Sequence, residues 1–236
     1  MSKEDAERGR KTGNIRAEDE DLSRMRAELE ELYKGFSQVN FDDLPQIDLY
    51  MDQVTTYLSS HLQALTRRPD SDKILTKTMI NNYAKAGILI APEKKKYTPD
   101  HMMLLLIIYF YKNFLSINDV AEVLQPLKDA CFTEEQQTGR QPRKSQGKSG
   151  NGKKLALEDV FAILEKSVTE QLEQSRLDIE KQIAESEKAV TPENLQSDAG
   201  TDTEMLRKFD CLCRIAADIY CKKLYIEKVL DEETQH

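Results

Sequence analysis

The sequence predicts an all-α protein that carries one small β-hairpin. Apolar residues recur at helical spacing through most of the chain, and 39% of its 236 residues are hydrophobic, which is enough for a core. Thr76 and Ser116 are residue types that open helices, and Gly87 is the type that ends one. A short lysine-rich segment, 88–97, interrupts the helical pattern and is typical of two strands about a turn.

Changes in composition divide the chain into five segments. Polar or basic stretches without periodic apolar residues are expected to be flexible, and periodic stretches are expected to be helical. The predicted segments are a disordered tail (1–17), an amphipathic helix (18–36), a central domain (37–137), a flexible basic linker (138–154) and a C-terminal helical hairpin (155–236).

The central domain is expected to contain four helices. The first runs from Pro45, a residue suited to a helix start, to about Leu65. The second lies between Thr76 and Gly87. The third, from Asp100 to Phe114, is apolar almost all round and should lie at the centre of the core, and the fourth opens at Ser116.

The helix at 76–86 is the candidate functional element. At about 100° per residue, Met79, Ile80 and Tyr83 share one arc that suits a core. The opposite arc has hydrogen-bonding and cationic side chains and no carboxylate: Lys77, Thr78, Asn81, Asn82 and Lys85. Lysines suit phosphates and an Asn amide can pair with the edge of adenine, so this face could read DNA, although a merely solvated polar face is the ordinary alternative.

The segment that follows this helix strengthens the DNA-binding interpretation. Residues 88–90 and 95–97 can pair as strands about a turn at Ala91–Lys94, in which Pro92 suits the first corner position. This basic wing, 91–97, would hold Lys94, Lys95 and Lys96 beside the end of the helix.

The charge distribution also favours this region. The net charge is −8, which argues against indiscriminate binding to nucleic acid. Between Arg67 and Asp100, however, eight cations stand against four anions. The acidity lies in the flanking helices.

These residues resemble the winged helix-turn-helix module of the mercury-resistance-regulator (MerR) family. In that family a recognition helix leads through a Gly-Leu-Leu-like segment into a basic wing, and a Tyr-Ser or Tyr-Thr pair opens the next helix. The chain has Gly87-Ile88-Leu89 and then Tyr97-Thr98 in the same order. The resemblance implies a MerR-like winged helix-turn-helix domain and adds Tyr83 and Tyr97, which match family positions, to the candidate DNA-binding residues.

The stretch from Leu44 to Leu124 is still more similar to an uncharacterised bacterial family of predicted DNA-binding proteins, known only as a domain of unknown function. The motifs that carry this similarity are 49–54, 75–83 and 95–97. The chain departs from the MerR pattern at two places. It has Asn81-Asn82-Tyr83-Ala84 where the MerR family has Arg-Tyr-Tyr-Glu, and it has a long connection, 64–75, where the MerR family has a tight turn.

Other classes of function find little support. Cys131, Cys211, Cys213 and Cys221 have no metal-finger spacing, so we expect free thiols, no metal and no cofactor. Three scattered histidines and no phosphate loop indicate no enzyme. The apolar run 102–111 is too short to span a membrane, and we expect a cytoplasmic protein.

The first expectation is therefore a sequence-specific transcriptional regulator that binds double-stranded DNA. The alternative is a non-enzymatic protein-interaction adaptor on the same scaffold, because fold alone does not decide function. The C-terminal helices need a partner for their apolar faces, which could be the N-terminal part of the chain or a second subunit. Because one short recognition helix gives limited affinity, we expect a homodimer.

Overall fold

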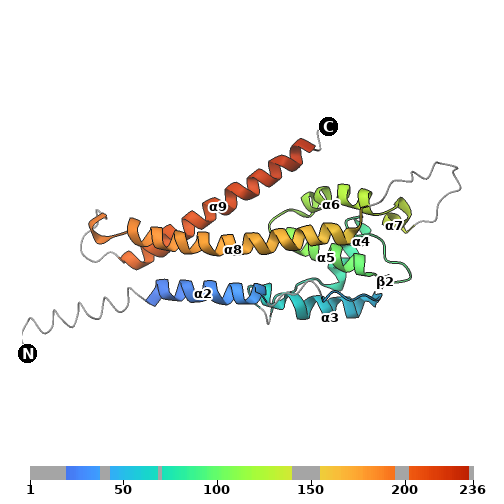
Figure 1. Cartoon of the computed structure of the whole chain (residues 1–236), viewed down its shortest axis with the longest axis horizontal. Coiled ribbons are helices and arrows are strands. Elements are labelled where there is room, and N and C mark those ends of the chain that lie inside the picture. The colour runs from blue at the N-terminus through green and yellow to red at the C-terminus, as the bar shows by residue number, and fades with distance from the viewer. Residues whose placement is uncertain (1–19, 38–42, 69–70, 140–154, 195–201, 234–236) are drawn as a thin grey trace, which may run out of the picture. The chain divides into compact units, whose positions relative to one another are not determined.

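The computed structural model describes residues 20–37, 43–68, 71–139, 155–194 and 202–233 (Figure 1). The predicted tail (1–17) and, apart from Thr138 and Gly139, the predicted linker (138–154) lie outside the described residues. The chain forms two compact units. Unit 1 combines the chain up to Gly35 with Glu170–Lys222, and unit 2 combines Phe36–Thr169 with the chain from Lys223 onward.

Helix α5 (Pro99–Lys112) is the centre of unit 2. Every residue from His101 to Tyr109 is buried, as expected for a helix that is apolar almost all round. The buried side chains of its neighbours belong to α3 (Met51–Leu62), α4 (Lys77–Lys85) and α6 (Ile117–Cys131). The prediction of a central helix here is confirmed.

Local capping residues set the limits of α4 and α6, as the sequence indicates. The Thr76 side chain accepts a hydrogen bond from the Met79 amide at 3.2 Å, which caps the start of α4. Gly87 has a φ of +71° and ends α4, because its left-handed conformation lets the Ile88 amide donate to the Tyr83 carbonyl at 2.9 Å. Ser116 and Asp119 form a reciprocal capping box at the start of α6.

The two-stranded sheet of unit 2 differs from the predicted hairpin. Strand β2 (Lys96–Tyr97) pairs antiparallel with β1 (Leu49–Tyr50), not with residues 88–90. The side chains of Ile88, Leu89 and Ile90 are all buried in the core instead. The same pairing corrects the start of the first helix: Leu49 and Tyr50 form β1, so α3 begins at Met51 rather than at Pro45.

The turn before β2 also lies later than predicted. The Lys96 amide donates to the Glu93 carbonyl at 2.9 Å, so the turn is Glu93–Lys96 and its central residues are Lys94 and Lys95. Both have positive φ angles, +51° and +65°, which is the sign pattern of a type I′ turn. Glycine and asparagine are the residues that usually occupy such positions, because most other side chains add strain there.

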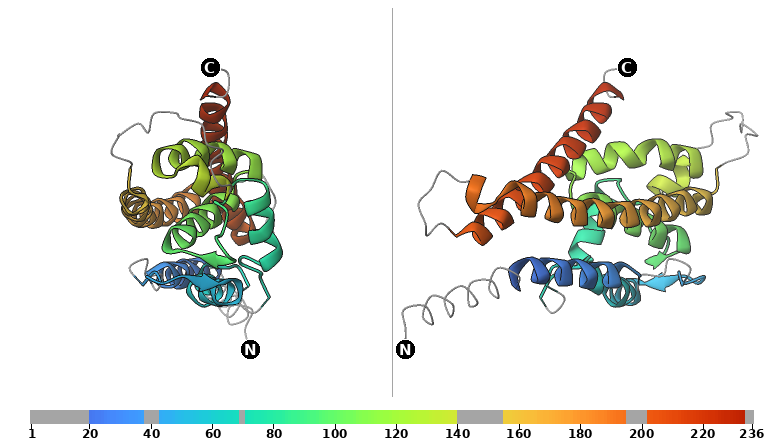
Figure 2. Two further views of the ribbon diagram at one scale, coloured as in Figure 1. Left: turned by 90° about the vertical axis from the view of Figure 1, so that its right-hand side faces the viewer. Right: turned by 60° about the vertical axis from the view of Figure 1, so that its left-hand side comes forward.

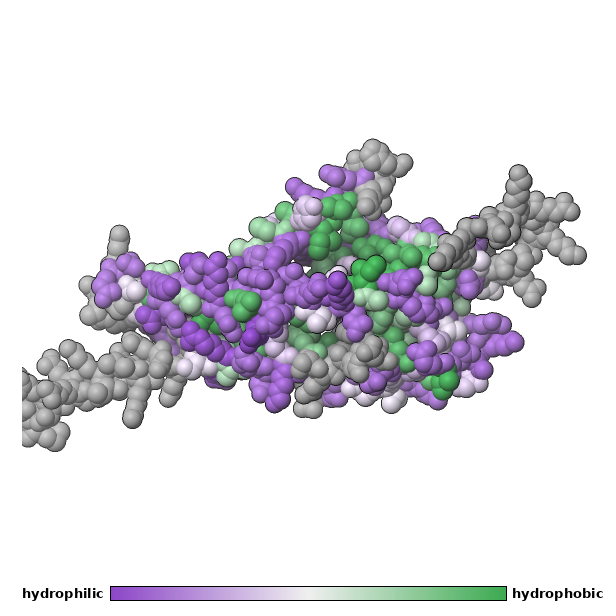
Figure 3. Space-filling model, viewed as in Figure 1, coloured by the Kyte–Doolittle hydropathy of each residue, from purple (hydrophilic) through white to green (hydrophobic). Residues whose placement is uncertain are grey.

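Three further segments complete unit 2. The short helix α7 (Glu134–Thr138) contacts the chain before the turn, since the Ala91 amide donates to the Gln137 carbonyl. Leu157 and Phe161 of α8 (Leu157–Ala189) and Leu230 of α9 (Thr203–Glu233) join the core. Figure 3 shows hydrophobic surface over the last turns of α9, where Tyr225 and Val229 are exposed.

Unit 1 consists of α2 (Glu20–Ser37, to Gly35), the later part of α8, the short helix η2 (Pro192–Asn194) and α9 up to Lys222. Its small core centres on Ile183 and Cys211, against which Met25, Ile179 and Ile215 pack. Ion pairs join its helices: Arg26 with Glu187 at 2.8 Å, and Arg176 with Glu30 at 2.9 Å.

In the part of the chain that the structure describes, none of the helices combines the length and apolar character that crossing a bilayer requires.

Candidate nucleic-acid interface

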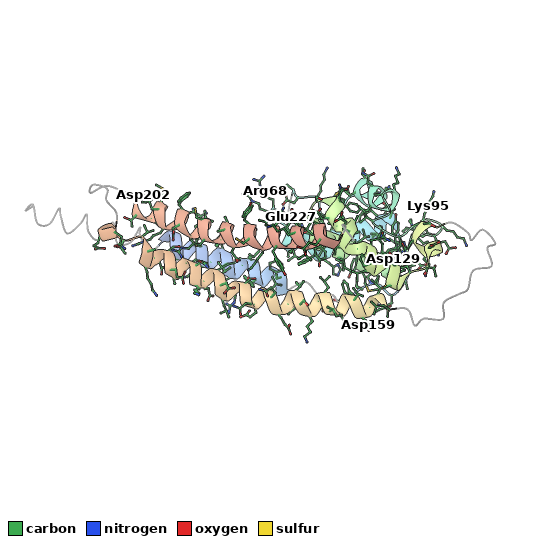
Figure 4. All side chains as sticks on the ribbon, turned by 90° about the horizontal axis from the view of Figure 1, so that it is seen from above. Arg68, Lys95, Asp129, Asp159, Asp202 and Glu227 are labelled. Atoms are coloured by element: carbon green, nitrogen blue, oxygen red, sulfur yellow. The ribbon has the colours of Figure 1, made fainter. Side chains whose placement is uncertain are left out.

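The outward face of α4 contains every polar residue that the sequence assigns to it. The side chains of Lys77, Thr78, Asn81, Asn82 and Lys85 are all exposed. Ile80 and Tyr83 are buried on the opposite side, and Met79 packs against the core. Figure 2 (left) and Figure 4 agree that α4 lies at an outer edge of unit 2, so this face is open to a ligand.

Tyr83 and Tyr97, the two residues added by family resemblance, lie in the core instead. Tyr83 is 8% exposed and Tyr97 is 2% exposed. Burial raises the pKa of both phenols, which stay neutral. Their rings support the interface from behind and do not form part of its surface.

Lys128 holds the C-terminal end of α4 from below. This α6 residue is buried, and its ammonium donates to the Gly87 carbonyl. A cation at the last carbonyls of a helix also interacts favourably with the helix dipole. Burial lowers the pKa of Lys128, and the neighbouring Asp129 carboxylate partly opposes this. The contact therefore ties the end of α4 to the core, and the apolar pattern of α6 alone did not predict it.

Two carboxylates approach the predicted cations. The Lys77 ammonium forms an ion pair with Asp52, which projects from the first turn of α3 and is itself exposed. The Lys94 ammonium lies 3.8 Å from the Glu93 carboxylate next to it in sequence. In the described part of the chain, no ion pair involves Lys85, Lys95 or Lys96.

The turn and α4 lie on the same side of unit 2. Figure 4 shows Lys95 and Arg68 along the edge that α4 follows, and Asp159 on the opposite side. Lys95 of the turn therefore lies on the side of unit 2 along which α4 runs. The predicted hairpin of 88–90 with 95–97 is absent, since the strand after this turn pairs with β1.

His101 lies beneath the turn and was assigned no role by sequence. Its side chain is 3% exposed, its Nδ1 atom accepts a hydrogen bond from the Thr98 amide at 3.1 Å, and its ring contacts Tyr97 edge to face. In the described part of the chain, its Nε2 atom forms no hydrogen bond. Burial lowers the pKa of His101 to about 4, against opposing effects from nearby backbone carbonyls and Asp48. Its position at the third residue of α5 was the signal for its capping role.

The cysteines and acidic residues form no metal centre among the described residues. No group of three or more His, Cys, Asp and Glu side chains there could hold an ion. Cys211 is buried in unit 1, whereas Cys213 and Cys221 are exposed.

Comparison with known proteins gives one match. A family model described as a domain of unknown function, DUF1836, matches residues 39–143, which cover most of unit 2 including α4, the turn and α5. No curated protein and no solved structure matches the chain. The match agrees with the expected resemblance to a domain of unknown function and assigns no activity.

Proposed function

We propose that the chain is a sequence-specific double-stranded-DNA-binding protein that regulates transcription. In this proposal α4 enters the major groove and presents Asn81 and Asn82 to base edges, with Lys77, Thr78 and Lys85 around them. Lys94, Lys95 and Lys96 of the Glu93–Lys96 turn contact phosphates, which position a protein on DNA without reading its sequence.

We further propose that unit 2 is a MerR-like winged helix-turn-helix domain. In this scheme α3 is the first helix, α4 the recognition helix and the turn with β2 the wing. The order of these elements supports the assignment. The pairing of β2 with β1 takes the place of a hairpin within the wing.

The observation that carries the proposal is the exposed face of α4. Five polar residues over nine positions project from the helix, none is a carboxylate, and two are asparagines. A solvated helix face in a chain of net charge −8 would ordinarily contain acidic residues. Amides that donate and accept in pairs are suited to adenine, and ammonium groups are suited to phosphates.

Selection from random duplexes, followed by binding measurements with variants, tests this proposal. The double variant Asn81→Ala/Asn82→Ala should lose discrimination between selected and scrambled duplexes, since a bidentate amide contact contributes about 1–3 kcal/mol. The matched control is Asn118→Ala, an exposed asparagine in α6, which should retain discrimination. Failure to enrich any sequence, or unchanged discrimination in the double variant, would contradict the proposal.

The second candidate is a protein-interaction adaptor. The ion pair between Lys77 and Asp52 favours it, because a carboxylate beside the α4 face would repel phosphates and could instead meet a cation on a protein partner. The two functions predict opposite effects of removing this carboxylate. Asp52→Asn should strengthen binding to DNA if the first proposal is right, and should weaken capture of a basic protein partner if the second is right.

A further inference from the structure

Helix α9 has two apolar faces, and the described residues of unit 1 cover only one of them. The covered face contains Cys211, which is fully buried, and Ile215, which packs against the Ile183 cluster. Arg214 beside them pairs with Asp210 at 2.7 Å and with Glu185 of α8 at 3.2 Å. These contacts fix which side of α9 packs against α8.

The second face lies about 120° around the helix from Cys211. It consists of Met205, Phe209, Leu212, Ala216 and Ile219, and we call these five residues the α9 stripe. The four large members are 53%, 63%, 51% and 57% exposed in chain order, and Ala216 is exposed as well. Scattered exposed apolar residues are ordinary, but a continuous apolar row along one helix indicates an interaction surface.

The spacing of the α9 stripe identifies the kind of partner. Its members are separated by four, three, four and three residues, which is the a and d repeat of a coiled coil. No charged residue interrupts the stripe between Met205 and Ile219, and Lys223 follows at the next core position and ends it. The partner is therefore an α-helix with an equally apolar row.

A second copy of α9 supplies such a row with matching volumes. If two copies run antiparallel about residue 214, Leu212 faces Ala216 of the other copy and Phe209 faces Ile219, while Met205 faces Lys223 at the edge. In the inner layers each larger side chain then meets a smaller one, as close packing requires. A parallel pair would place Ala216 against Ala216 and leave a cavity there, at a cost in stability.

We propose that the α9 stripe is a homodimer interface in which two copies of α9 pack antiparallel. The stripe spans about four helical turns, so we expect dissociation at low micromolar concentration rather than an obligate dimer. The inference is independent of DNA binding, because the stripe and the α4 face share no residue. A dimer would, however, present two copies of α4, one for each half-site of a duplex.

Light scattering on the full chain without DNA tests the interface. At concentrations well above this dissociation range the wild type should approach twice the 27.1 kDa monomer mass, and Phe209→Lys/Leu212→Lys should have the monomer mass with unchanged helical circular dichroism. The matched control, Leu177→Lys/Tyr225→Lys, replaces two exposed apolar residues outside the stripe and should remain dimeric. A monomeric wild type, or a dimer that survives the stripe substitutions, would overturn the inference.

Disulfide cross-linking tests the direction of pairing. In a chain carrying Cys213→Ser and Cys221→Ser, Leu212→Cys and Ala216→Cys are prepared as separate proteins. The mixture should cross-link on mild oxidation and each protein alone should not, because the antiparallel pair brings positions 212 and 216 together. Cross-linking of Leu212→Cys with itself would overturn the antiparallel arrangement.

Discussion

At the scale of single residues, His101 connects the core of unit 2 to the turn. Its Nδ1 atom accepts from the Thr98 amide, and its ring touches Tyr97 of β2. Burial lowers its pKa to about 4, from an ordinary value of 6.5. The folded protein therefore holds a neutral imidazole directly beneath the segment that we assign to phosphate contacts.

This lowered pKa predicts a loss of stability in acid. Between pH 6.5 and 4 the unfolded chain binds a proton at this histidine and the folded chain does not, so the free energy of unfolding falls as pH decreases. The contribution of the neutral imidazole to the free energy of unfolding is complete above pH 6.5. About 3 kcal/mol of it is lost by pH 4, because each pKa unit corresponds to 1.36 kcal/mol. Urea unfolding at pH 7 and pH 4.5 measures it.

The variant that isolates this effect is His101→Gln. A glutamine at the third helical position can still accept from the Thr98 amide, so the cap of α5 is retained while the titration is removed. Its stability should depend less steeply on pH than that of the wild type. Equal slopes for the variant and the wild type would contradict the assignment.

Lys94 and Lys95 predict a conflict between stability and binding. Both have positive φ angles, which favour Asn and Gly, so Lys94→Asn/Lys95→Gly should stabilise the fold by about 1–2 kcal/mol. The same change removes two proposed phosphate contacts and should weaken DNA binding. Lys96→Ala, where φ is not positive, should weaken binding without the gain in stability. Thermal unfolding measures the stability of both variants, and duplex titration measures their affinity for DNA. A double variant less stable than the wild type would contradict the type I′ turn.

At the scale of elements, the contact between α3 and α4 places a carboxylate beside the proposed DNA-binding face. Asp52 pairs with Lys77, and both side chains are largely exposed. Asp52→Asn should therefore change stability little, because exposed ion pairs contribute little. It should raise affinity for a selected duplex roughly fivefold, since removing one like charge near phosphates is worth on the order of 1 kcal/mol.

Fluorescence anisotropy at fixed salt measures this affinity. The control is Asp159→Asn, which removes the same charge on the opposite side of unit 2 (Figure 4) and should have no such effect. An unchanged or lower affinity for the duplex in Asp52→Asn would contradict the placement of this carboxylate beside bound phosphates.

The elements also show where sequence reasoning succeeds. Thr76, Gly87 and Ser116 mark helix ends correctly because capping depends on hydrogen bonds within a few residues. The predicted pairing partner of β2 was wrong, because residues 88–90 and 49–50 are both short segments that could form the neighbouring strand. Choosing between them depends on which one the core of α5 buries, and local pattern does not contain that information.

At the scale of the whole molecule, charge is distributed unevenly. The chain has a net charge of −8, yet the side of unit 2 that exposes α4 also has Arg68 and Lys95. The sequence predicted this local excess and the outward residues of α4. It did not predict the Asp52 contact or the Lys128 anchor, because both join helices that are distant in sequence.

The salt dependence of DNA binding tests the central claim most directly. For a selected duplex, the slope of log affinity against log salt should become shallower by about 2 to 3 in Lys94→Ala/Lys95→Ala/Lys96→Ala, because each lost lysine–phosphate contact removes about one unit. The control Lys181→Ala/Lys188→Ala/Lys228→Ala changes net charge equally and should keep the wild-type slope. If instead the two triple variants have the same slope, the turn makes no phosphate contacts and unit 2 does not bind DNA in the proposed way.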